Sequence, residues 1–259
     1  MRDLTSIAKS DILKSRIITM KNKYVKRSKI SASKFREIIR YYALDLSATK
    51  IAILSKVSRN TINRYLIEMR KIIYEYCSNI QEIECGEIEI DESYFGAKRK
   101  RKKRGKRGKR GRGASNKTIV FGLLQRKGKV YTHIVPDASA DSLIPIIRQQ
   151  ANEQVEINSD GWKGYNSLVD VGYQKHYRVY HGENEFAKGK NHINGIESFW
   201  GYAKHRLMQF KGVKKELFKL HLKECEYRFN LRGENVYKEM LKLFRDHPLF
   251  VKERKVAIL

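Results

Sequence analysis

The chain has 259 residues, of which 55 are Lys or Arg and 28 are Asp or Glu, so it carries a formal net charge of +27. A positive field of this size makes a polyanionic partner the default expectation. With 41% hydrophobic and 10% aromatic residues, the chain can bury a core, which excludes a solvated basic tail. Charge alone also suits a ribosomal protein, a chromatin-like protein or a repressor, so sequence motifs are needed to choose among these classes of protein.

Cysteine usage and apolar run length place the chain in a reducing compartment away from membranes. The three cysteines include no Cys-x-x-Cys pair, which argues against a disulfide framework and leads us to expect no zinc. The longest apolar runs fall far short of the roughly 20 residues that span a bilayer. We therefore expect a cytoplasmic protein without membrane insertion.

Residues 1–85 are predicted to form a helical DNA-binding module. Within it, residues 47–69 have the layout of a helix-turn-helix: Ala52 where two helices cross, Val57 in the turn, and Ile62 with Leu66 on the buried stripe of the second helix. Lys56 occupies the turn position that glycine often holds.

Ser58 is predicted to cap the second helix of this module. Four polar residues near the outward, N-terminal part of that helix are candidates for groove contacts: Arg59, Asn60, Asn63 and Arg64. An ordinary helical hairpin packed on the next domain would give the same pattern.

From Glu87 the periodicity changes to alternation, and an α/β domain is predicted over residues 86–210. The expected elements, in order, are strands at 87–95, 118–125 and 130–135, a helix at 139–152, a strand at 155–158, a short helical piece, a strand near 177–180 and a helix at 192–208. This order is that of an RNase H-like fold, a mixed sheet with helices on both faces. Residues 211–259 are predicted to be a helical C-terminal segment packed on the core.

A basic insert at residues 98–113 separates the first two predicted strands. It consists of four glycines and twelve cations: Lys98, Arg99, Lys100, Arg101, Lys102, Lys103, Arg104, Lys106, Arg107, Lys109, Arg110 and Arg112. Such a segment cannot bury a core. One hypothesis is a loop that binds phosphates beside an active site, with release of counterions. The other is a nonspecific basic insert without fixed contacts.

Two aspartates stand where this fold would bring them together. Asp91 lies on the first strand, and Asp160 directly follows a short apolar strand, at the carboxyl end where α/β folds place ligands. Glu87 and Glu89 precede Asp91 on the same face of the first strand. Each aspartate has an ordinary explanation: Glu87, Glu89, Asp91 and Glu92 could be the solvated side of an edge strand, and Asp160-Gly161 could be a simple turn.

The helix at 192–208 offers a third acidic group. Ile196, Trp200, Ala203 and Leu207 fall on one arc of this helix, whereas Asn194, Glu197 and Lys204 cluster along its border. Glu197 and Lys204 are seven residues apart and face the same way. A carboxylate that binds metal and a cation that holds a phosphate would suit a catalytic edge, although any amphipathic helix can carry Glu and Lys at its boundary.

Three converging carboxylates would suit phosphodiester chemistry. Two Mg²⁺ ions roughly 3.5–4 Å apart can activate an oxygen nucleophile and stabilise the leaving oxygen. Hard cations of this kind prefer carboxylate oxygens. We expect Mg²⁺ as the cofactor, with Mn²⁺ able to substitute.

Four ordered blocks resemble the ISXO2-like transposases of bacterial insertion sequences, the IS1595 superfamily: residues 89–96 (EIDESYFG), 111–118 (GRGASNKT), 159–165 (SDGWKGY) and 192–200 (HINGIESFW). The resemblance covers roughly residues 86–210. It implies an RNase H-like integrase core of the DDE type that cleaves DNA and transfers strands at terminal inverted repeats with Mg²⁺. It also implies a bacterial, nucleoid-associated protein whose partners are double-stranded terminal repeats and target DNA.

The resemblance matches the family's two aspartates to Asp91 and Asp160 and its later basic residue to Lys204. Family members use Glu or Asn as the third ligand, and this chain offers Glu197 and Asn194; we favour Glu197 because a carboxylate brings charge. Many relatives carry an N-terminal zinc ribbon, for which this chain has no cysteine pairs, so the helix-turn-helix would take its place.

Two other functions stay open. An RNase H-like nuclease or resolvase would hydrolyse strands without joining them, and a protein derived from a transposase could bind DNA without cutting it. Because pairing two element ends requires more than one protomer, we expect a homodimer or a higher oligomer on DNA.

Overall fold

The computed structural model describes residues 22–79, 82–96, 117–160, 173, 176–179, 193–210 and 212–250. These residues belong to two compact units. One contains residues up to 72 together with those from 233 onward, and the other contains residues 73–232. The helix α4 (Arg59–Ser78) contributes residues to both.

The first unit is built from helices. In α2 (Ala32–Ala43), Phe35, Ile38, Ile39 and Tyr42 form a buried stripe at helical spacing. The helix α8 (Val236–Asp246) packs against α2, and two short strands, β1 (Val25–Lys26) and β7 (Leu249–Phe250), pair in parallel. The expected C-terminal segment 211–259 is therefore divided, because α8 belongs to this unit and the helix before it belongs to the other.

A three-residue turn joins α3 (Ala48–Ser55) to α4. Lys56 has a φ of 54°, in the left-handed region where glycine is favoured. Ser58 Oγ accepts the Thr61 N–H at 3.2 Å and caps α4, as predicted. Ile62 and Leu66 are buried, also as predicted.

The second unit contains a five-stranded mixed sheet in the order β4-β3-β2-β5-β6. Its strands are β2 (Glu87–Phe95), β3 (Thr118–Gln125), β4 (Val130–Val135), β5 (Glu156–Asp160) and β6 (His176–Val179). The first three are antiparallel, and β2, β5 and β6 are mutually parallel neighbours. With α5 (Ala140–Gln150) between β4 and β5 and α6 (Asn194–Met208) after β6, the predicted RNase H-like element order is confirmed. The short helical piece expected after Asp160 falls outside the described residues.

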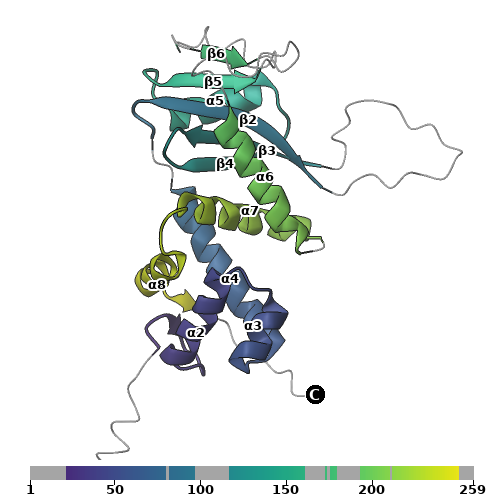
Figure 1. The fold of residues 1–259 in the computed structure, drawn as a ribbon, viewed down its shortest axis with the longest axis vertical. Helices are drawn as coiled ribbons and strands as arrows, with labels where there is room; N and C mark the ends of the chain where they lie inside the picture. Colours follow the sequence, from purple (N-terminus) through teal and green to yellow (C-terminus); the bar gives the residue numbers. More distant parts are fainter. Residues whose placement is uncertain are drawn as a thin grey trace, which may run out of the picture. The chain divides into compact units, whose positions relative to one another are not determined.

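Helices cover both faces of the sheet because residues of β2 and β3 alternate between two cores. One core joins the β2 residues Ile88 and Ile90 to Leu143 and Ile147 of α5. The opposite core joins β3 to α6 and α7 (Lys215–Asn230) through Val120, Leu124, Ile196, Phe199 and Leu222. Figure 1 shows α5 behind the sheet and α6 in front of it. The second face carries the candidate site.

The helices that the structure describes include none that is both long and apolar enough to cross a membrane.

Candidate active site

Asp91 and Asp160 lie on the neighbouring parallel strands β2 and β5. The register pairs Glu89 with Asn158 and Ile90 with Ser159, so the next positions along the two strands are Asp91 and Asp160. Paired residues of parallel strands point to the same face. The two carboxylates therefore belong to the α6 face. The alternative that residues 87–92 form the solvated side of an edge strand is wrong, because β2 is the central strand.

The Asp91 carboxylate is oriented by two hydrogen bonds. The Trp200 indole Nε1 donates to Oδ2 at 3.0 Å, and the Glu92 backbone N–H donates to Oδ1 at 2.8 Å. Gly122, opposite Asp91 on β3, makes room for the indole, since a Cβ there would lie 2.7 Å from Trp200 Cζ2. Helical periodicity placed Trp200 in the core but could not reveal this bond, because it depends on a glycine of another strand.

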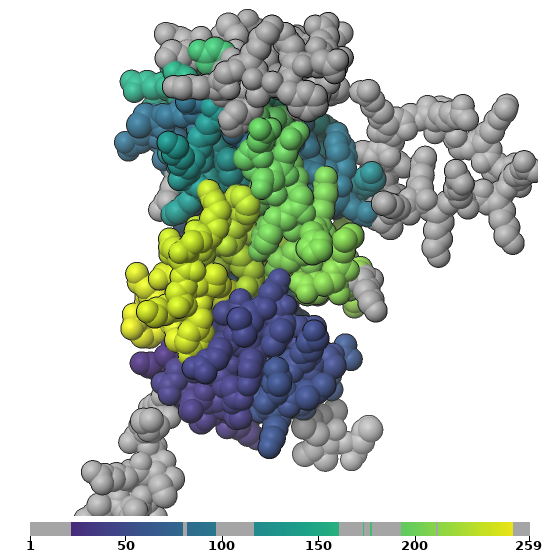
Figure 2. All heavy atoms as spheres, viewed as in Figure 1, coloured from purple at the N-terminus to yellow at the C-terminus, as the bar shows by residue number. Residues whose placement is uncertain are grey.

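Glu197 lies in the first turn of α6, and Asn194 is the first residue of that helix. Both side chains are exposed. Lys204 is also exposed, and its Nζ lies 6.0 Å from the ring centroid of Phe95, the last residue of β2. Figure 2 shows α6 (green) against the strands (blue to teal), with its outer side at the surface. Along the part of α6 that runs beside β2, Glu197 lies near the beginning and Lys204 lies two helical turns later.

Electrostatics links the three acidic groups. Burial and, after it, the negative charges of Asp160 and more weakly Glu197 together raise the pKa of the Asp91 carboxyl from 3.8 to about 7. The hydrogen bonds from Glu92 and Trp200 oppose it. A carboxyl with neighbours of like charge is stabilised in its ionised form by a bound cation.

The donor set fits a hard divalent cation, because it offers two carboxylates on adjacent strands and a third within electrostatic reach. In the part of the chain that the structure describes, no three His, Cys, Asp or Glu side chains gather closely enough to hold a metal ion. The sheet thus supplies the pair Asp91 and Asp160, and Glu197 is the third acidic group whose charge reaches Asp91.

The raised pKa of Asp91 predicts a specific pH dependence of stability without metal. Native Asp91 keeps its proton up to about pH 7, whereas the unfolded chain loses it near pH 3.8, so the native state binds the proton more tightly. Stability from this group is therefore lost as the pH rises towards 7. Relative to Asp91→Asn, the wild-type protein should lose about 2 to 3 kcal/mol of unfolding free energy between pH 5 and pH 8. Urea unfolding of both proteins with a chelator measures this; a pH-independent difference between them would contradict it.

The other predicted site residues belong to the first unit or fall outside the described residues. Arg59, Asn60 and Asn63 are exposed on the first turns of α4, and Arg64 is half-buried. The basic insert, from Lys98 to Gly113, falls outside the described residues, as does the segment that follows Asp160.

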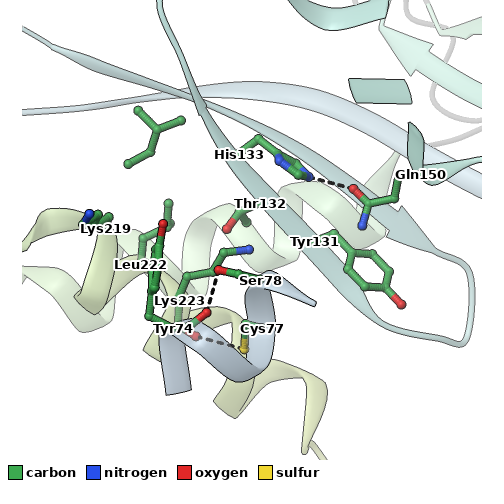
Figure 3. Close-up of a pocket in the computed structure, with 11 residues that line it drawn as sticks. Tyr74, Cys77, Ser78, Tyr131, Thr132, His133, Gln150, Lys219, Leu222 and Lys223 are labelled. Atoms are coloured by element: carbon green, nitrogen blue, oxygen red, sulfur yellow. Dashed lines mark hydrogen bonds between the residues drawn. The ribbon is translucent and has the colours of Figure 1, made fainter. Parts of the chain in front are cut away.

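A cavity of about 440 Å³ lies elsewhere in the second unit, beside the edge strand β4. Figure 3 shows side chains from β4, α7 and the end of α4 around it, with His133 hydrogen-bonded to Gln150. None of the residues lining it is an Asp or a Glu. We therefore place the candidate chemistry on the α6 face of the sheet and not in this cavity.

The fold and the site together define an RNase H-like domain with acidic side chains gathered on one face of its central strands. Residues 85–230, more than half of the chain, match the ISXO2-like transposase domain, and the chain belongs to this transposase family. The expected family resemblance is confirmed.

Two relatives agree with this membership. The chain is 44% identical over 104 residues to an uncharacterized transposase-like protein of Haemophilus influenzae. The matched region covers 40% of this chain and 83% of that protein. The chain is 30% identical over 172 residues to an uncharacterized protein in transposable element ISH50 of Halobacterium salinarum, covering 60% of this chain and 57% of the relative. The chain thus spans little more than half the length of the second relative.

Solved structures similar to this chain include the catalytic core domain of BIV integrase, with a TM-score of 0.35 at 14% identity over 60% of this chain and 93% of that one. A pre-cleavage Mos1 transpososome gives a TM-score of 0.26 at 10% identity over 86% and 80% of the two chains.

Proposed function

We propose that this member of the ISXO2-like transposases is a DDE-type enzyme that cleaves DNA at terminal inverted repeats and joins the ends to target DNA. The observation that carries the proposal is the placement of Asp91 and Asp160 side by side on β2 and β5. Family membership supplies the substrate class. Transposition, and not simple hydrolysis, is the function that the two together support best.

Asp91, Asp160 and Glu197 would hold Mg²⁺, or Mn²⁺ in its place. The bound ions would supply an activated oxygen nucleophile and a stabilised leaving oxygen. The chain's own task is to keep the carboxylates oriented. Trp200 and the Glu92 backbone N–H hold Asp91, and the raised pKa of Asp91 makes metal binding compete with protonation below about pH 7.

DNA would be held by cations on several elements. The turn between α3 and α4 would act as a helix-turn-helix, with the exposed residues Arg59, Asn60 and Asn63 and the half-buried Arg64 directed to a groove. Lys204, beside Phe95 at the end of β2, and the basic insert that follows would contact phosphates.

The proposed partners are double-stranded terminal repeats and target DNA, bound by a homodimer or a higher oligomer in the bacterial cytoplasm. The net charge of +27 supports a polyanionic partner.

A strand-transfer assay tests the proposal. A precleaved terminal repeat, taken from DNA flanking the gene, is incubated with the full chain, a target plasmid and Mg²⁺. The proposal expects repeats joined to the plasmid. Cleavage without joined product would support the nuclease or resolvase alternative, and binding without either reaction would support a noncatalytic DNA-binding protein.

The choice between Glu197 and Asn194 as third ligand makes a separate prediction. Because a carboxylate brings the charge that metal binding needs, Glu197→Gln should slow cleavage about 100-fold or more, whereas Asn194→Ala should slow it by less than about tenfold. Single-turnover cleavage rates over a range of Mg²⁺ concentrations measure both. The reverse order of the two effects would assign the third ligand to Asn194.

A further inference from the structure

Glu89 is a buried carboxylate beside the proposed metal site that the reaction scheme leaves without a role. It stands two residues before Asp91, on the same face of the central strand β2, and is only 1% exposed. A buried carboxylate is costly unless it is paired and hydrogen-bonded. The partners of Glu89 therefore indicate what it does.

The first partner is the beginning of α6. Glu89 Oε2 accepts the Ile196 backbone N–H at 2.9 Å. The first N–H groups of a helix have no partner within the helix, and the N-cap residue Ile193 makes no side-chain capping bond. Glu89 thus caps α6 from a strand that is more than 100 residues away in sequence.

The close approach requires a residue without a side chain. A Cβ on Gly195 would lie 2.8 Å from Glu89 Oε2 and 2.5 Å from Leu124 Cδ2. Any side chain at this position would therefore force the ends of the Leu124 and Glu89 side chains, or the first turn of α6 itself, to shift. The absence of a side chain at Gly195 therefore permits the contact between Glu89 and α6.

The second partner is Arg126, which follows β3. Its Nε donates to Glu89 Oε1 at 3.1 Å, and its Nη1 contacts Glu87 Oε2. The guanidinium charge compensates the buried carboxylate and holds one of its oxygens in place. Glu89 can then direct its other oxygen to α6.

We propose that Glu89 is a positioning residue that fixes the first turn of α6 on β2 and so sets where Glu197 stands relative to Asp91 and Asp160. Glu197 directly follows Ile196, and the Trp200 bond to Asp91 fixes the next turn of the helix. The inference rests on the proposed function for the role of Glu197. It also separates Glu89 from the metal ligands, although Glu87, Glu89 and Asp91 share one face of β2.

The test compares Glu89→Ala and Glu89→Gln in the full chain with Glu87→Gln, which alters the other contact of Arg126 without touching α6. Mn²⁺ affinity is measured by calorimetry without DNA. Losing a residue that orients ligands typically weakens metal binding 10- to 100-fold, so Glu89→Ala should bind Mn²⁺ at least about tenfold more weakly. Glu89→Gln keeps an acceptor for the Ile196 N–H and should lose less, and Glu87→Gln should match the wild-type protein.

Hydrogen exchange gives a readout that needs neither metal nor activity. Loss of the cap should speed exchange of the Ile196 amide about fivefold in Glu89→Ala but not in Glu87→Gln. If Glu89→Ala does not fold, Gly195→Ala provides the same test with the carboxylate intact. Its expected effects on Ile196 exchange and Mn²⁺ affinity have the same direction.

Two outcomes would overturn the inference. Equal loss of Mn²⁺ binding in Glu89→Gln, Glu89→Ala and Asp91→Asn would make Glu89 a ligand. Unchanged Mn²⁺ affinity and Ile196 exchange in folded Glu89→Ala would leave it only a structural role. If Asp91→Asn binds Mn²⁺ as tightly as the wild-type protein does, the proposed metal site itself fails, which distinguishes that failure from the failure of the positioning role.

Discussion

Replacing Asp91 or Asp160 with asparagine should reduce strand cleavage and joining by at least about 1,000-fold, because each substitution removes a charge that would hold Mg²⁺. DNA affinity should change by less than about threefold, since the cations proposed to bind phosphates remain. Asparagine keeps an acceptor at position 91 for the Trp200 indole, so the local packing is preserved. Gel-based cleavage and strand-transfer assays measure the first quantity, and filter binding measures the second.

Asp141→Asn is the matched control for these variants. Asp141 is exposed in the first turn of α5, a helix that packs on the opposite face of the sheet. The Asp141→Asn protein should retain wild-type cleavage and joining activity. If Asp91→Asn cleaves DNA as fast as Asp141→Asn does, the carboxylate mechanism is wrong, and a transposase-derived protein that only binds DNA becomes the better description.

The second large effect is expected at Glu224, a buried residue of α7. Its Oε1 accepts from Arg206 Nη2 at 2.5 Å and from Arg228 Nε at 3.0 Å, and all three side chains are at most 6% exposed. Removing one member of a buried ionic group leaves uncompensated charge and costs about 3 to 5 kcal/mol. Glu224→Leu should lower the free energy of unfolding by that amount, measured by urea unfolding.

Two comparisons sharpen the Glu224 prediction. Glu68→Gln breaks a more exposed pair with Lys71 and should change stability by less than about 1 kcal/mol. The triple variant Arg206→Met, Glu224→Leu, Arg228→Met should recover much of the loss, because apolar replacement of a whole buried ionic group is often neutral. A Glu224→Leu protein as stable as Glu68→Gln would show that the ionic group does not hold α6 to α7.

Periodicity predicted the strands and helices well because each pattern has a local cause. Alternation from Glu87 and the helical spacing of Ile196, Trp200 and Ala203 report which side of an element is buried. The structure confirms which side of each element is buried. The same alternation put Glu89 on the face of Asp91, but it could not separate a ligand from a residue that orients the helix.

Local patterns and ordered motifs were enough to predict the RNase H-like element order, the family and the shared face of Asp91 and Glu89. The cap that Glu89 provides for α6, the bond from Trp200 to Asp91 and the division of the two C-terminal helices between units follow only from the folded structure. Periodicity gives the direction of a side chain but does not identify its partner. The two hydrogen bonds join residues more than 100 positions apart in sequence, and the division of the helices depends on how separately predictable elements pack.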